Sequence, residues 1–283
     1  MAMKVTVLVE GTRLRDRRDL IAEHGLSIHI RHDGQQTLFD TGATDAFSRN
    51  AERLGVSIQE VGRAVISHHH SDHGGGLAHF LKTNAKAKVY LRGPVDADHY
   101  TRRIGILSQR IGLDKRLFQK YPDRFEFVNE LTEISPDVFI LTEIGDRYPQ
   151  PEGDSYLLAK EGDTRRLDTF EHDLILVMQE EEGLVAFTGC SHRGILNLAD
   201  AVSRQFPGHP IKALFGDFHQ PGLKAGSKRR LEDIGRELLK YPVGRVYTGH
   251  CTGVRAFRVL KQVMGAKLQH LPAGSTVEIW GKW

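Results

Sequence analysis

A short run of histidines and glycines constrains this chain more than any other feature of its sequence. Residues 68–76 read His-His-His-Ser-Asp-His-Gly-Gly-Gly and follow the apolar run 63–67, which we expect to be a buried strand. Side chains alternate along an extended chain, so His68 and His70 should point to one side and His69 to the other. Imidazole and carboxylate groups suit zinc, iron or manganese. A surface histidine cluster is the alternative, but a His-x-His-x-Asp-His string at a strand end favours a metal site.

Length and composition set the broad class. The chain has 283 residues, 40% of them hydrophobic, and we predict a single domain over residues 1–283. A formal net charge of only +3 disfavours a general nucleic-acid binder. The two cysteines, Cys190 and Cys251, are too few for a disulfide framework and favour a reducing compartment. No window has the roughly 20 apolar residues of a membrane span, and no signal peptide is evident, so we expect a cytoplasmic protein without membrane contact.

Strand-like and helix-like segments follow one another along the chain. Apolar runs predict strands at residues 4–9, 26–31, 37–39, 64–67, 88–91, 138–141, 155–159, 174–179, 184–188, 211–215, 245–248 and 276–280. The apolar spacing of residues 195–202 and 231–238 predicts two amphipathic helices. Ser57 and Glu60 have the spacing of a capping box. This pattern predicts an α/β fold, a layered sandwich with sheets inside and helices outside.

Two later segments end an apolar strand with a small residue and then a histidine. His192 follows the run 184–188, and His250 follows the run 245–248. Loops at strand ends gather at one rim of an α/β sheet, where binding sites are usually built. Alone, each histidine would more often be structural. Beside the first motif, we expect both to be metal ligands.

Other polar side chains at strand ends can serve the same site. Asp217 and His219 follow the run 211–215, and their spacing does not decide between ligand, acid–base group and substrate contact. An acid at a strand end often only caps a turn. Asp40 also follows a strand and can orient a metal-bound histidine from behind. Cys190 is a candidate for contact with the metal.

Residues 101–124 form a strongly basic segment, with seven basic residues against two acids. As a lid, this segment would neutralise an anionic substrate, with Arg102 and Arg103 touching it. As a solvated helical insert, its charges would serve solubility. Both interpretations stay open at the level of sequence.

Together these motifs resemble the metallo-β-lactamase superfamily. The resemblance rests on His68-x-His70-x-Asp72-His73, on Leu38-Phe39-Asp40-Thr41-Gly42 and on the later single histidines, and it spans nearly the whole chain. Segments 23–27, 188–195, 216–219 and 250–253 are similar to the branch named after the dihydropterin ribofuranosyl-aminobenzene phosphate synthase of methanopterin biosynthesis.

The resemblance implies an αββα sandwich, two mixed β-sheets packed face to face with helices outside, and two divalent metal ions at one edge. Zinc is the first choice, with manganese or iron as alternatives. The implied ligands are His68, His70 and His192 for one metal and Asp72, His73 and His250 for the other. Cys190 stands where most members have a bridging aspartate, which leaves the bridging ligand and the second metal open. Asp217 stands where the branch usually has glycine.

These observations predict a metal-dependent hydrolase that acts on a phosphorylated small molecule or a phosphodiester through a metal-bound hydroxide. Asp72 and His219 are the expected catalytic residues, with His219 as a general acid or a contact to the leaving group. One alternative is a phosphoribosyl-type transferase, after the name of the branch. Another is a non-catalytic metal- or ligand-binding signalling protein, and single-iron redox chemistry also occurs on this fold. The expected partner is a small anionic substrate.

Overall fold

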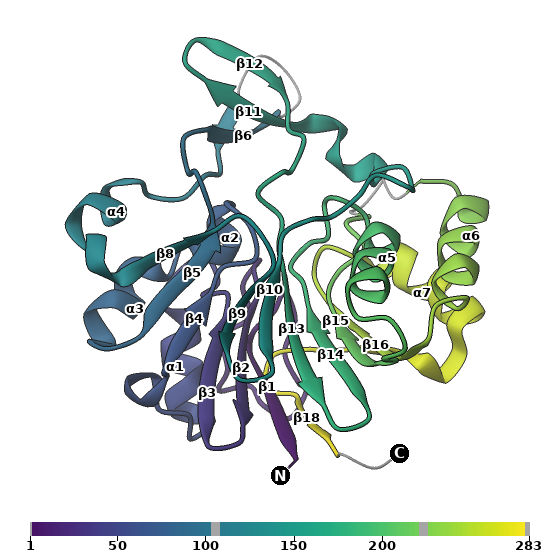
Figure 1. Ribbon diagram of the computed structural model, residues 1–283, viewed down its shortest axis with the longest axis horizontal. Helices are drawn as coiled ribbons and strands as arrows, with labels where there is room; N and C mark the ends of the chain where they lie inside the picture. Colours follow the sequence, from purple (N-terminus) through teal and green to yellow (C-terminus); the bar gives the residue numbers. More distant parts are fainter. Residues whose placement is uncertain (1, 103–107, 221–225, 281–283) are drawn as a thin grey trace. The chain divides into compact units, whose positions relative to one another are not determined.

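The computed structural model describes residues 2–102, 108–220 and 226–280, and its contacts group the chain into two compact units. The first unit comprises Met1–Asn129, Leu157–Leu167 and Leu271–Trp283. The second unit comprises Glu130–Tyr156 and Asp168–His270. Each unit combines a seven-stranded sheet with helices, which confirms the predicted α/β class (Figure 1).

The large sheet of the first unit has the order β18-β1-β2-β3-β4-β5-β8. Its strands are β1 (Met3–Val9), β2 (Ser27–His32), β3 (Gln35–Phe39), β4 (Arg63–Val65), β5 (Lys88–Arg92), β8 (Phe125–Val128) and β18 (Thr276–Ile279). Because β3, β4, β5 and β8 run parallel, their carboxyl ends meet at one edge of the sheet. Asp40 and residues 66–73 leave the sheet at that edge.

The described part of this unit also contains short helices, most of which lie at the left of Figure 1. They are α1 (Ala46–Arg53), α2 (Ser71–Gly74), α3 (Leu77–Thr83) and α4 (Arg116–Lys120), with 3-10 turns η1 (Ile58–Glu60) and η2 (Pro122–Arg124). Phe47 of α1 and Phe80 of α3 are buried in one core with Leu38 of the sheet. The predicted capping box is wrong, because the Ser57 hydroxyl donates to the Gln59 side chain at 3.2 Å and caps no backbone amide.

A second, four-stranded sheet of the first unit has the order β12-β11-β6-β7. Its strands are β6 (Asp98–Arg102), β7 (Ser108–Arg110), β11 (Leu157–Glu161) and β12 (Thr164–Leu167). The described part of the basic segment 101–124 therefore consists of strand, loop and a short helix. It is not the single helical insert that one interpretation expected.

Several charges of the basic segment are paired within the first unit. Arg110 and Lys115 lie 3.3 Å and 3.2 Å from the Asp98 carboxylate, and Arg116 lies 2.8 Å from Asp114. Arg102 is exposed at the end of β6. Arg103, the other predicted substrate contact, lies outside the described residues.

The sheet of the second unit has the order β17-β16-β15-β14-β13-β10-β9. Its strands are β9 (Thr132–Ser135), β10 (Val138–Leu141), β13 (Ile175–Glu180), β14 (Gly183–Phe187), β15 (Ile211–Phe215), β16 (Val243–Thr248) and β17 (Leu268–His270). The strands from β14 to β17 run parallel, so the loops after β14, β15 and β16 leave the same edge. These three loops carry His192, His219 and His250.

Three helices pack on this second sheet (Figure 1). They are α5 (Ile195–Gln205), α6 (Lys228–Leu238) and α7 (Val254–Met264), with 3-10 turns η3 (Glu152–Tyr156) and η5 (Gly265–Lys267). Leu198, Leu231 and Leu260, one from each helix, are buried in a common core with the sheet. The two predicted amphipathic helices are confirmed as α5 and α6. Across the described ranges, no helix has the length and hydropathy needed to cross a bilayer.

Candidate metal centre

A buried carboxylate organises the histidine motif of the first unit. Asp40 follows β3, is fully buried and has a positive φ of 58°. Its Oδ2 accepts a hydrogen bond from Nδ1 of His73 at 2.6 Å, and its Oδ1 accepts one from the Ser67 amide at 2.7 Å. The Ser67 hydroxyl lies 2.8 Å from Asp40 Oδ2 and 2.9 Å from Nδ1 of His68. Asp40 therefore orients His73 directly and His68 through Ser67.

The predicted ligands of the first unit lie together. The ring centroid of His68 is 4.6 Å from that of His70 and 4.1 Å from that of His73. A carboxylate oxygen of Asp72 lies 3.6 Å from Nε2 of His73. The three imidazoles are buried, whereas Asp72 is partly exposed. Three imidazoles and one carboxylate are a donor set that suits zinc.

His69 is turned toward strand β5. Its Nε2 lies 2.7 Å from the backbone oxygen of Arg92. Because a carbonyl oxygen only accepts hydrogen bonds, Nε2 of His69 is the donor. A nitrogen that carries this hydrogen has no lone pair for a metal.

The glycines after the motif allow the backbone to pack closely. The His73 carbonyl accepts a hydrogen bond from the Thr41 amide at 2.7 Å. A Cβ atom at Gly75 or Gly76 would collide with the backbone oxygens of Ala43 and Thr41. Larger residues would therefore push the α2 turn away from the loop after β3.

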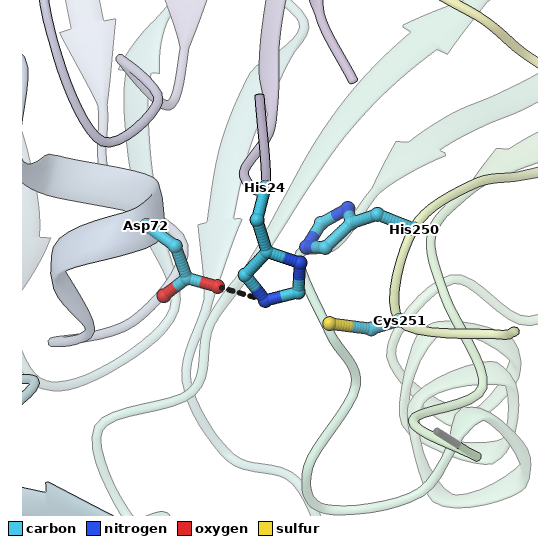
Figure 2. A group of neighbouring side chains, drawn as sticks. All are labelled: His24, Asp72, His250 and Cys251. Atoms are coloured by element: carbon cyan, nitrogen blue, oxygen red, sulfur yellow. Dashed lines mark ion pairs between the residues drawn. The ribbon is translucent and has the colours of Figure 1, made fainter. Parts of the chain in front are cut away.

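A further histidine of the first unit lies beside Asp72. Nε2 of His24 is 3.5 Å from an Asp72 carboxylate oxygen, as the dashed line in Figure 2 shows. The His24 side chain is largely exposed. Sequence reasoning did not select it, although its segment 23–27 belongs to the similarity noted above.

In the second unit, one buried carboxylate lies against two histidines. Oδ1 of Asp154, in η3, is 2.7 Å from Nδ1 of His192 and 2.6 Å from Nδ1 of His219. Burial works to raise the pKa of Asp154, but the two histidines outweigh it and hold that pKa below its ordinary value. Sequence reasoning missed Asp154, because it follows no strand and no ligand-like spacing surrounds it.

The surroundings of His219 favour its protonated form. Burial works to lower its pKa, but hydrogen bonds and charge from Asp154 and Cys251 outweigh burial and raise it to about 10. The His219 ring lies 4.2 Å from the His192 ring, centroid to centroid. An imidazolium can donate a proton to a leaving oxygen, which is the role that the sequence analysis predicts for His219.

Backbone strain gathers near these histidines. Ser191, His219 and Phe170 have positive φ angles of 57°, 40° and 54°. The Phe170 ring stacks on His192 at 4.4 Å and 8°. Non-glycine residues rarely adopt positive φ, and where they do they often mark functional sites.

Asp217 holds the loop that carries His250. Its Oδ1 accepts hydrogen bonds from the Gly249 amide at 2.5 Å and the Thr248 hydroxyl at 2.9 Å. Its Oδ2 accepts one from the Cys251 amide at 2.9 Å and lies 3.2 Å from Nδ1 of His250. Both oxygens of Asp217 therefore bind the loop and its histidine, as in the turn-capping interpretation.

Cys190 and Cys251 are buried neighbours in the second unit. Their sulfur atoms are 3.0 Å apart, and neither forms a disulfide. Burial works to raise the pKa of Cys251, but the Cys190 thiol and His250 outweigh it and hold that pKa well below its ordinary value. Cys190 Sγ also lies 3.8 Å from Nε2 of His250. Figure 2 shows the His250 and Cys251 side chains on adjacent residues.

The donor atoms of each unit fit a divalent metal. Metal-binding histidines usually donate one ring N–H to an oxygen and ligate through the other nitrogen. Here the Nδ1 hydrogen-bond partners are Ser67 for His68, Asp40 for His73 and Asp154 for His192, and Nδ1 of His250 forms an ion pair with Asp217 at 3.2 Å. In His68, His73 and His192 the Nε2 atoms are then available to ligate a metal, and the carboxylates behind His73 and His192 raise the basicity of those two rings.

Known proteins are similar to this chain over most of its length. The model of the metallo-beta-lactamase superfamily matches residues 21–250. The crystal structure of Tm1679, a metal-dependent hydrolase of the beta-lactamase superfamily, is 32% identical, with a TM-score of 0.82, and the match covers 98% of this chain and 99% of that one. A diphosphatase from the PhnP family is 17% identical with a TM-score of 0.54, covering 99% and 98%, which shows a shared fold.

A curated relative carries a specific name. The 7,8-dihydropterin-6-methyl-4-(beta-D-ribofuranosyl)-aminobenzene-5'-phosphate synthase of Methanocaldococcus jannaschii is 26% identical over 271 residues. The match covers 91% of this chain and 90% of the relative. The branch that the sequence motifs resembled is therefore found among the relatives.

Proposed function

Because this chain belongs to the metallo-beta-lactamase superfamily, we propose that it is a metal-dependent hydrolase of a phosphorylated small molecule or a phosphodiester. The observation that carries the proposal is the pairing of a buried carboxylate with histidine Nδ1 in both units, Asp40 with His73 and Asp154 with His192. Such pairs fix the tautomer and orientation that metal ligation needs.

The proposed ligands are the six residues expected from the motifs. They are His68, His70, Asp72 and His73 from the first unit and His192 and His250 from the second. When bound, two divalent ions, with zinc as the first choice, supply a nucleophile at neutral pH and neutralise charge on the phosphoryl group.

The remaining roles fall to residues around the ligands. Nδ1 of His219 is held by Asp154, and the protonated ring would supply the proton to the leaving oxygen. Asp72, partly exposed between His24 and His73, accepts the proton that the attacking water loses. Arg102 and Arg103 bind the charge of the small anionic substrate.

A phosphoribosyl-type transferase is the second candidate. It is supported by the relative from Methanocaldococcus jannaschii, whose name describes a synthase of a ribofuranosyl-aminobenzene phosphate. A transferase would consume a phosphoribosyl donor only together with an aromatic amine or acid acceptor. A hydrolase needs water alone, so omission of the acceptor separates the two candidates.

The test is a substrate panel on protein purified without chelator. Phosphomonoesters, phosphodiesters and a phosphoribosyl donor with and without an acceptor are assayed for release of phosphate, alcohol or pyrophosphate. We expect phosphoester turnover that chelation abolishes and zinc or manganese restores. Protein with a full metal complement that hydrolyses no phosphoester would exclude the hydrolase proposal. Turnover that requires the acceptor would favour the transferase.

A further inference from the structure

A mostly apolar pocket opens beside two of the histidine-bearing loops of the second unit. Its volume is about 190 Å³. Its apolar walls are formed by Tyr148, Pro149, Ile195, Leu196, Phe218 and Ile234. Gly194 also lines it, two residues after His192, and Phe218 and Gln220 flank His219 on either side. A group bound there would therefore lie next to the two loops that carry His192 and His219.

The pocket holds one buried polar group that calls for a partner. The Gln220 side chain lines the pocket, and the residue is only 1% exposed. Within the described ranges, its Oε1 has no hydrogen-bond partner, while its backbone amide donates to the Cys251 carbonyl at 2.8 Å. A buried acceptor without a donor is unfavourable, so a ligand N–H or O–H would be stabilised there.

The charged residues around the pocket compensate one another. Arg230, which lines the pocket, lies 2.6 Å from Glu152, which does not. Asp233 lies 2.9 Å from Arg236, and Glu237 is paired with Lys240 at 2.5 Å. The pocket thus offers no uncompensated charge of either sign, and a neutral group fits it better than an ion.

Size and shape restrict the occupant to a single ring. An apolar cavity of about 150 Å³ is large enough to hold benzene. The pocket here is slightly larger, at about 190 Å³, and leaves room for one small substituent. Aromatic and proline side chains in its walls suit a flat ring.

We infer that this pocket binds the non-reacting part of the substrate, an uncharged aromatic ring whose hydroxyl or amino group donates a hydrogen bond to Oε1 of Gln220. The inference rests on the proposed function, because the ring would be joined to the phosphoryl group that the metal centre handles. Gln220 and Ile234 would then determine which leaving groups or substituents are accepted.

Binding of phenol and toluene to the metal-loaded protein tests the pocket without any turnover. The two molecules have nearly the same shape, but only phenol carries a donor. Ligand-observed NMR should show phenol binding about 2- to 12-fold more tightly than toluene, the range expected for one net hydrogen bond. Gln220→Leu should remove this preference, and Gln179→Leu, at a distant glutamine on β13, should leave it unchanged.

Substitutions that fill the pocket test whether both molecules bind there. Ile234→Phe should abolish binding of both molecules, whereas Leu239→Phe, a similar change at a half-buried position that does not line the pocket, should not. Leu196→Phe fills the pocket from α5 and serves if Ile234→Phe lowers the Tm. Binding that survives both pocket-filling variants occurs elsewhere and would overturn the inference. Equal affinity for phenol and toluene in the wild-type protein would overturn the role of Gln220.

Kinetics separate this inference from the proposed function. The measured quantity is the ratio of kcat/KM for phenyl phosphate to kcat/KM for ethyl phosphate. This ratio should be about fivefold lower in Ile234→Phe than in the wild-type protein. The intrinsic difference between the two leaving groups is the same in both proteins and cancels. If the protein hydrolyses phosphoesters but this ratio is unchanged in Ile234→Phe, the inference of a ring pocket would be overturned and the hydrolase proposal would stand. If phenol binding depends on the pocket but no phosphoester is hydrolysed, the ring pocket would be supported and the hydrolase proposal would be excluded.

Discussion

At the scale of single residues, the recurring device is a buried acid behind a histidine. Asp40 holds His73, Asp154 holds both His192 and His219, and Asp217 lies at 3.2 Å from His250. Loss of such a partner typically weakens metal binding about 10- to 100-fold. Asp40 and Asp217 follow strands, whereas Asp154 lies in the 3-10 turn η3, so the sequence indicated a role for Asp40 but not for Asp154.

The first expected outcome concerns the middle histidine of the motif. His69→Ala should leave the metal content nearly unchanged, because Nε2 of His69 donates to the Arg92 carbonyl. His70→Ala should reduce the metal content sharply, since it removes a proposed ligand. Elemental analysis of both variants after identical dialysis makes the comparison. Equal losses would show that His69 is also a ligand.

The two cysteines should be titratable as thiols. Their sulfur atoms lie 3.0 Å apart, outside the roughly 2.05 Å of a disulfide bond. Protein purified and unfolded without reductant should therefore give two thiols per chain in a colorimetric titration. A variant with Cys251→Ser should give one. A titration that finds no thiol in the wild-type protein would contradict the reducing compartment expected from the sequence.

At the scale of elements, the sequence predicted the buried strands well and the polar ones poorly. Every predicted strand is present, because strands such as β13 and β14 are apolar over most of their length. The sequence did not indicate β6, β7, β8, β9, β12 or β17, all of them short. Of these, β6, β7 and β12 are mostly polar, and β12 is exposed along its whole length. Such strands form because a neighbour offers backbone hydrogen bonds, and this has no signature in hydrophobic spacing.

In the candidate metal centre, too, the sequence indicated the residues that follow apolar strands and missed others. His68, His192 and His250 follow apolar strands, so the ends of those strands revealed them. Asp154 and His24 lie in irregular segments, and only the fold brings Asp154 to His192 and His24 to Asp72. Asp40, which follows a strand, was predicted to act behind a ligand, so the sequence hides mainly those supporting residues that follow no strand.

Helix α5 is tied to its surroundings by Asp200. This buried acid accepts hydrogen bonds from Arg204 at 2.7 Å, Arg147 at 2.9 Å and Tyr241 at 3.0 Å. Burial works to raise its pKa, but these three partners outweigh burial and lower it. A lowered folded pKa stabilises the protein above the unfolded value of roughly 4, and this contribution is lost as the pH falls through the folded value.

Asp200→Asn should therefore lower the free energy of unfolding by about 1–2 kcal/mol at pH 7. The difference from the wild-type protein should shrink as the pH is lowered from about 4 toward 3, because the wild-type carboxylate becomes protonated there. Urea unfolding at several pH values measures it. Asp163→Asn, at an exposed carboxylate, is the control and should have little effect at any pH. A deficit that remains constant down to pH 3 would exclude the charge as its cause.

A second prediction at the scale of elements concerns the basic segment 101–124. Arg102→Ala should raise KM for a phosphorylated substrate about two- to fivefold at low salt and weaken the salt dependence, because a basic rim concentrates anions and salt screens it. Arg116→Ala is the matched control in the same segment, since Arg116 is already paired with Asp114. The metal content should not change in either variant. Unchanged kinetics at both salt concentrations would favour a solvated segment.

At the scale of the whole molecule, the chain visits each unit more than once. Residues 157–167 and 271–283 return to the first unit after segments of the second. Both units place their histidines after parallel strands, β4 in the first and β14 to β16 in the second. The family match from residue 21 to residue 250 extends over both units, so the proposed activity belongs to the chain as a whole.

The metal stoichiometry is the sharpest test at this scale. Six proposed ligands are more than one tetrahedral zinc accepts, so we expect about two metal ions per chain in protein purified without chelator. His192→Ala should lower the metal content. His209→Ala, which changes a loop histidine of the same unit that is not a proposed ligand, should not. One equivalent that does not rise on addition of zinc or manganese would exclude a dinuclear centre. In that case a mononuclear site would have to use only part of the set, and the loss in each of the six alanine variants would identify which ligands it keeps.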